Sequence, residues 1–177
     1  MKIPQIRKQT KNQMLVQMSL LIALSYLGSL IKIQGSIALD ALPAYYGALM
    51  LGPLPGAVIG ILGHFLTALT SGFPMTLPLH LFIACSMGVT VGLFGYLAKN
   101  ASQILAIIAG VALNGPVSTL GAAYISSLMG LGFSGKIMFY ALVVPLTLTS
   151  AVNVFGGLLL YRTVARYRGQ EKIHEVS

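Results

Sequence analysis

Long apolar runs follow one another along this chain, each closed by a proline, a glycine or a short polar break. A run of roughly 18 or more apolar residues can cross the hydrocarbon core of a bilayer, about 30 Å thick, as a helix. Of the 177 residues, 56% are hydrophobic and only 8% are charged, a composition far from that of a soluble domain. The sequence therefore predicts an all-α integral membrane protein.

Six membrane spans fit this pattern best, at about residues 14–33, 38–51, 53–71, 78–97, 102–126 and 137–162. The second is short, and "GPLPG" (residues 52–56) separates it from the third because prolines interrupt helices. "SGFPMTLP" (residues 71–78) and "KNASQ" (residues 99–103) mark two further turns. We therefore predict a six-transmembrane-helix bundle. A five-span alternative merges the second and third runs.

The basic residues are distributed unequally between the two sides of this bundle. With six spans, one side carries Lys2, Arg7, Lys8, Lys11, Lys99, Arg162, Arg166, Arg168 and Lys172, and the other carries Lys32 and Lys136. By the positive-inside rule both termini are cytoplasmic in a multi-pass protein of the cell membrane. We expect a basic N-terminus over residues 1–13, a membrane domain over 14–165 and a cytoplasmic tail over 166–177. Five spans would fit this distribution worse, and the net charge of +8 needs no nucleic-acid partner.

Asp40 is the sole acidic residue before Glu171. A carboxylate near a bilayer costs several kcal/mol unless it is paired or faces water. Asp40 is either a structural partner for Lys32 or Lys136, or a hydrogen-bond acceptor in a ligand pocket that opens outward.

Other polar and aromatic side chains also lie in or near the spans. The candidate ligand-binding residues are Asp40, Tyr45, His64, Phe73, His80, Asn114 and Asn153. Each also has an ordinary role: imidazoles are often packing residues, Asn114 can satisfy backbone groups freed by Pro116, and aromatic rings anchor at membrane interfaces.

Signatures of catalysis are weak. "GFSG" (residues 132–135) matches a motif of intramembrane proteases, but Ser134 has no histidine in the following span to act as its base. The chain has no phosphate-binding loop, so any uphill transport must be driven by a partner or an ion gradient. The lone Cys85 cannot form an intrachain disulfide. We expect no enzyme activity, no cofactor and no metal.

Small residues recur at four-residue spacing in the first span, at Ser19 and Ala23 and again at Ser25 and Ser29. Such spacing permits close helix packing in lipid.

The order of these features resembles the substrate-binding S components of energy-coupling factor (ECF) vitamin transporters. The resemblance covers essentially the whole chain and is most specific in "GSIALDALPAYYGALMLGPLPGAVIGILGHFLTALTSGFPMTLPLH" (residues 35–80) and in Asn114-Gly115-Pro116. It implies a six-helix bundle that captures a vitamin or its precursor from outside. It also implies docking onto a membrane coupling subunit driven by two cytoplasmic ATPases, with Ser19 and Ala23 nearest to the family's Ala-x-x-x-Ala docking element.

Within the family, residues 36–80 look most like members assigned to α-ribazole, a benzimidazole nucleoside used in cobalamin synthesis. Other members take pantothenate, riboflavin, thiamin precursors or biotin. A second class of function stays open, an autonomous proton-coupled carrier in which Asp40 or a histidine relays protons.

Overall fold

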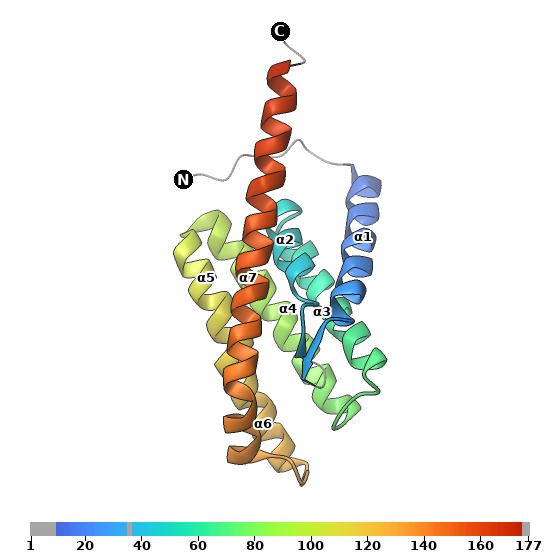
Figure 1. The fold of residues 1–177 in the computed structure, drawn as a ribbon, viewed down its shortest axis with the longest axis vertical. Coiled ribbons are helices and arrows are strands. Elements are labelled where there is room, and N and C mark those ends of the chain that lie inside the picture. The colour runs from blue at the N-terminus through green and yellow to red at the C-terminus, as the bar shows by residue number, and fades with distance from the viewer. Residues whose placement is uncertain (1–9, 35–36, 175–177) are drawn as a thin grey trace.

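The computed structural model describes residues 10–34 and 37–174, and over these residues it is a helical bundle with one short hairpin (Figure 1). The elements in chain order are α1 (Lys11–Ser29), β1 (Lys32–Gln34), β2 (Ile37–Ala38), α2 (Leu42–Met50), α3 (Pro53–Thr70), α4 (Leu77–Asn100), α5 (Gln103–Ala112), the π-helix η1 (Leu113–Val117), α6 (Ser118–Leu128) and α7 (Gly135–His174). The predicted all-α membrane architecture is confirmed. Of the basic residues assigned to the termini, Lys2, Arg7 and Lys8 lie outside the described residues.

Local sequence sets where the helices begin. Thr10 caps α1 through a reciprocal pair of hydrogen bonds with Gln13, and Thr76 and Ser102 cap α4 and α5. Pro53 opens α3 after Gly52, whose φ of 112° favours glycine. The prolines of "GPLPG" therefore start a helix as well as separating two, and α2 and α3 are distinct, as the six-span reading requires.

Four helical segments are long and apolar enough to cross a membrane: Pro53–Thr70, Leu77–Asn100, Gln103–Leu128 and Gly135–Tyr167. The nine residues of α2 rise only about 14 Å, half of a hydrocarbon core. The 19-residue α1 carries polar side chains along its length and is not among the four. Six full spans are therefore not confirmed: the bundle has four candidate spans and two other helices.

The first two predicted spans also have different ends. Residues 30–33 and 38–41 are not helical, because the chain turns there into the antiparallel hairpin β1–β2, which pairs Lys32 with Ala38 and Gln34 with Ile37. Isoleucine-rich sequence on both sides of a Gly-Ser pair suits a hairpin as well as an apolar helix end.

Alternate helices run in opposite directions, so the connections fall into two groups at opposite ends of the bundle (Figure 1). The start of α1, the α2–α3 and α4–α5 turns and the C-terminal end of α7 lie toward one end. The β1–β2 hairpin and the α3–α4 and α6–α7 connections lie toward the other. Helix α7, with 40 residues and about 60 Å long, extends well beyond its neighbours.

Two contacts hold α1 and α2 in this bundle. Ser25 and Ser29 are fully buried, and Gly63 on α3 lies so close that a Cβ there would meet Ser25 at 2.9 Å. Tyr45 is fully buried on α2, with its ring edge on Phe94 of α4 at a centroid distance of 5.0 Å.

Candidate functional site

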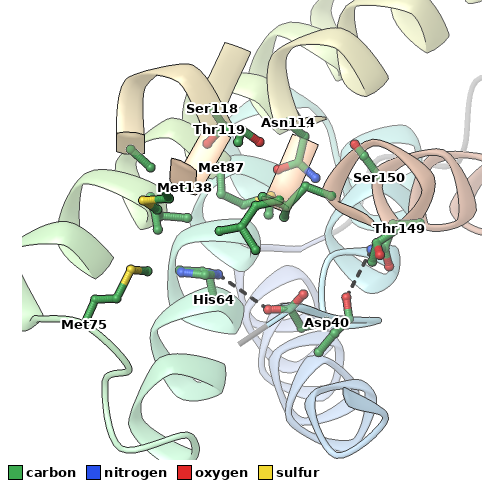
Figure 2. A pocket seen from close by; sticks show the side chains of 16 residues that line it. Asp40, His64, Met75, Met87, Asn114, Ser118, Thr119, Met138, Thr149 and Ser150 are labelled. Atoms are coloured by element: carbon green, nitrogen blue, oxygen red, sulfur yellow. Dashed lines mark hydrogen bonds and ion pairs between the residues drawn. The ribbon is translucent and has the colours of Figure 1, made fainter. Parts of the chain in front are cut away.

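A pocket lies between α3, α4, η1, α6, α7 and the segment that enters α2 (Figure 2). It holds about 680 Å³ of empty space, a figure that includes its open mouth. Its lining consists of Ala38, Asp40, His64, Met75, Ile83, Met87, Asn114, Ser118, Thr119, Ala122, Met138, Leu142, Leu146, Thr149, Ser150 and Asn153. Because Met75 belongs to the α3–α4 connection, the pocket reaches the end of the bundle where the hairpin lies.

The carboxylate of Asp40 is 6% exposed and is held from α3. Thr67 donates its hydroxyl to Oδ2 of Asp40 at 2.6 Å, and Nδ1 of His64 lies 3.7 Å from the same oxygen. That second contact is an ion-pair distance, too long for a hydrogen bond. Both of these contacts are made through Oδ2 of the carboxylate.

Asn153 lies on α7 and is 1% exposed. Its Nδ2 donates to the carbonyl of Ala38 at 3.4 Å. Its Oδ1 is buried without a hydrogen-bond partner. A buried amide oxygen without a donor is unusual in proteins, and in a pocket wall it marks a place for a ligand donor.

Most hydroxyl groups of the lining already donate a hydrogen bond to a backbone carbonyl oxygen. Thr119 donates to the carbonyl of Gly115 and Thr149 to that of Pro145, each at 2.7 Å. Ser150 donates to Gly110 at 3.4 Å. A hydroxyl has one proton and two lone pairs, so each of these oxygens can only accept from a ligand. We call Asp40, Thr119, Thr149, Ser150 and Asn153 together the acceptor wall.

The π-helix η1 brings Asn114 to this pocket. Pro116 has no amide hydrogen, so a regular α-helical ladder cannot continue through it, and the wider π turn accommodates it. Gly115 permits close approach of α7, since a Cβ there would meet Thr147 at 2.9 Å. Figure 2 shows Asn114 between Thr119 and Ser150 and above Asp40.

The structure brings together four of the seven predicted ligand residues: Asp40, His64, Asn114 and Asn153 all line the pocket. Whether they bind a ligand stays a prediction.

The other three lie outside the lining. His80 is fully buried behind His64, with its Nδ1 3.4 Å from Nε2 of His64. Phe73 packs edge-on against His80, with ring centroids 5.9 Å apart. Tyr45 donates its hydroxyl to the carbonyl of Gly110, near the end of α5, at 3.3 Å.

The sequence prediction missed the methionines, the serines and the threonines of the lining. A signal for some of them exists: Leu146, Thr149, Ser150 and Asn153 recur at three- and four-residue spacing on one face of α7. Hydroxyl residues that share a face with a buried asparagine in an apolar helix indicate a polar cavity.

The structure gives no support to catalysis or metal binding in the part it describes. Ser134 lies in the turn before α7, where its carbonyl accepts the amide of Met138. Among the described side chains, no three His, Cys, Asp or Glu residues gather in a way that could hold a metal ion.

Comparison with known proteins agrees with this architecture. The family model for the substrate-specific component of ECF transporters matches residues 13–165. The chain therefore belongs to the ECF transporter substrate-specific components, the substrate-binding subunits of a membrane importer. No curated protein and no solved structure matches it.

Proposed function

We propose that the pocket is the capture site of this substrate-specific component. We further propose that it takes a neutral or weakly basic heterocycle carrying several hydrogen-bond donors, with α-ribazole the leading candidate. The acceptor wall is the observation that carries the proposal. Ribose hydroxyls can donate to the carboxylate of Asp40 and to Oδ1 of Asn153, and the latter is buried without a hydrogen-bond partner.

The charge of the wall argues against an anionic vitamin. A carboxylate such as that of pantothenate would meet Asp40 and the lone pairs of Thr149 and Ser150. Lys32 and Lys136 were the candidates to compensate; Lys136 is exposed and does not line the pocket, and the side chain of Lys32 is not described.

The remaining lining suits a planar ring. Met75, Met87 and Met138 line the pocket, and Figure 2 shows Met75 and Met138 on the side away from Thr149 and Ser150. Thioether side chains are flexible and make favourable contacts with aromatic rings. A benzimidazole can rest on these methionines while its sugar meets the acceptor wall.

For the docking face we propose the side of α1 that carries Ser19 and Ala23. Both residues are exposed, whereas Ser25 and Ser29, six positions further along, face into the bundle. The two small-residue pairs thus lie on different faces of one helix, and the outward pair faces away from the bundle. The coupling subunit, with its two ATPases on the cytoplasmic side, is the partner we expect there.

The test is titration of the purified protein with α-ribazole, pantothenate, riboflavin and thiamin, repeated with Asp40→Asn. We expect α-ribazole to bind and the variant to bind it at least about tenfold more weakly, since one charge-assisted hydrogen bond is lost. Tight pantothenate binding without α-ribazole binding would overturn the ligand. Concentrative uptake by the isolated protein under a proton gradient would favour the secondary carrier instead.

A further inference from the structure

The side chain of Asn114 lines the pocket, and none of the hydrogen bonds among the described residues involves it. One role open to it from the sequence was to satisfy backbone groups freed by Pro116, and within the described residues it makes no such contact. A side-chain amide has two donor hydrogens and an acceptor oxygen. The pocket wall therefore carries, at the π-helix, a half-buried amide whose hydrogen-bonding capacity the described chain leaves unused.

The π-helix η1 holds this amide in place. One turn before it, the carbonyl of Gly110 accepts the hydroxyls of Tyr45 from α2 at 3.3 Å and of Ser150 from α7 at 3.4 Å. Next to it, Gly115 packs so closely on α7 that a Cβ would meet Thr147 at 2.9 Å. Single π turns occur frequently at functional sites. An amide on a backbone fixed from two sides loses little freedom when a ligand binds, which favours recognition.

Most hydrogen-bond donors of the acceptor wall are already engaged within the protein. The hydroxyls of Thr119, Thr149 and Ser150 each donate to a backbone carbonyl oxygen. Nδ2 of Asn153 is engaged with the carbonyl of Ala38. The wall therefore offers lone pairs to a ligand and suits ligand groups that carry hydrogen.

Two further polar residues of the lining also face protein groups. Ser118 is hydrogen-bonded to Ser86 of α4 at 3.3 Å. The ring nitrogens of His64 lie 3.4 Å from a ring nitrogen of His80 and 3.7 Å from the Asp40 carboxylate. In the part of the chain that the structure describes, the amide of η1 is thus the lining group with both of its amide hydrogens unengaged.

The proposed ligand contains a polar atom that the acceptor wall does not satisfy. Ribose hydroxyls can donate to the wall, but the unsubstituted ring nitrogen of a benzimidazole has a lone pair and no hydrogen. Such a nitrogen needs a donor when it is buried. In the view of Figure 2, Asn114 lies between Met138 on one side and Ser150 and Thr149 on the other. It therefore lies between the side suited to the ring and the side suited to the sugar.

We propose that Asn114 is a specificity-determining residue that donates from Nδ2 to an unprotonated ring nitrogen of the ligand. This inference rests on the proposed ligand site and narrows the substrate class. The ligand is an aromatic heterocycle with a bare nitrogen at its edge and a substituent whose hydroxyls meet the acceptor wall. A ring with carbon in that position leaves Nδ2 of Asn114 without an acceptor.

The experiment removes the two partners of this hydrogen bond separately. The wild-type protein and Asn114→Leu, which keeps the approximate shape of the side chain, are titrated with α-ribazole and with its indole analogue, in which carbon replaces the bare ring nitrogen. We expect the wild type to bind α-ribazole about tenfold more tightly than the analogue, and the variant to bind both within about twofold. Equal binding of the two compounds by the wild type, or the same preference in both proteins, would overturn the role of Asn114.

Asn153→Leu is the matched control. It removes an acceptor for the sugar, so it should weaken the binding of both compounds by a similar factor and keep the preference of about tenfold for α-ribazole. Loss of this preference in Asn153→Leu would show that the ring nitrogen is not recognised by Asn114 in particular.

The melting temperature of the ligand-free Asn114→Leu protein tests the competing structural role. An amide that the protein leaves unused can be replaced without loss, so we expect the melting temperature to stay the same or rise. A clear fall would assign Asn114 to the support of the π turn and overturn the proposal.

Failure of the ligand proposal can be told apart from failure of this one. If α-ribazole does not bind, the two proteins are compared with riboflavin and thiamin, whose rings also carry bare nitrogens. About tenfold weaker binding of either by Asn114→Leu would uphold the role of Asn114 with a different ligand. Equal binding by the two proteins, or no binding of any of these compounds, would overturn it.

Discussion

The hydroxyl of Thr67 donates to Oδ2 of Asp40 at 2.6 Å. His64, on the same helix α3, places its Nδ1 3.7 Å from the same oxygen. One carboxylate from the segment before α2 is thereby bound to one turn of α3. This arrangement holds Oδ2 of Asp40 against α3.

Replacing Thr67 by valine keeps the shape of the side chain and removes this donor. We expect a loss of about 1–3 kcal/mol in stability, because a buried carboxylate loses a hydrogen bond. Thermal unfolding of the detergent-solubilised protein measures it. Thr163→Val is the matched control, since that exposed hydroxyl donates only to Leu159 within its own helix. Equal melting temperatures for the two variants would contradict the prediction.

Asn153→Leu should change stability and binding in different ways. The unpaired Oδ1 of Asn153 contributes nothing to the empty protein, and its Nδ2 makes only a 3.4 Å contact, so the melting temperature should stay nearly unchanged or rise. Ligand affinity should fall about tenfold or more, because the ligand loses an acceptor. A large loss of stability with unchanged affinity would assign Asn153 to packing alone.

Bulky side chains on the outward face of α1 should prevent assembly without affecting capture. In Ser19→Leu with Ala23→Leu, the added volume separates α1 from a partner helix, and the pocket is lined by other elements. Copurification with the coupling subunit and uptake should both fall, with ligand affinity unchanged. Ala141→Leu, on the exposed face of α7, is the control. Normal assembly of the double variant would remove the docking assignment.

Gly63 permits the close contact between α1 and α3. A Cβ at Gly63 would meet Ser25 at 2.9 Å, and relieving that clash should cost about 1–3 kcal/mol in Gly63→Ala. Gly92→Ala is the control: its Cβ would lie 3.5 Å from Ala57, an ordinary contact, and alanine favours the helix. Unfolding curves should therefore shift in opposite directions. A stabilised Gly63→Ala would show that the helices are not tightly packed there.

The orientation of the bundle can be measured by cysteine labelling in a Cys85→Ala background. Two exposed residues lie at opposite ends of the bundle: Gly132 in the α6–α7 connection and Asn100 at the end of α4. If both termini are cytoplasmic, a membrane-impermeant thiol reagent should label Gly132→Cys in intact cells and Asn100→Cys only after lysis. The reverse pattern would invert the predicted topology.

Much of the architecture could be predicted because proline and glycine act locally. Proline is favoured in the first turn of a helix. Pro53 and Pro78 lie in the first turns of α3 and α4, so the turns before these helices could be predicted from the sequence. The charge of Asp40 made it conspicuous for a similar reason, since a carboxylate in an apolar chain needs partners.

Tertiary contacts decided what could not be predicted. Tyr45 was a candidate ligand residue, with interfacial anchoring as the alternative, but it contacts Phe94 and Gly110 in the core. The apolar letters around residues 30–41 fit a helix and a hairpin equally well, and pairing across the chain selects the hairpin. Thr149 can only accept from a ligand because its hydroxyl donates to the carbonyl of Pro145, and a sequence pattern does not predict that hydrogen bond.

If the ligand binds at the acceptor wall, the pocket should select among ligands mainly through the free energy lost when a buried acceptor is left without a donor. An analogue that lacks one donor leaves a buried oxygen without a hydrogen bond, which costs roughly 1–3 kcal/mol and lowers the affinity about ten- to a hundredfold. In the proposed site, an analogue with an extra methyl group on its ring would meet apolar side chains, among them flexible methionines that can move aside. Selectivity in this protein should therefore be strict toward the loss of a hydroxyl and lenient toward added hydrocarbon.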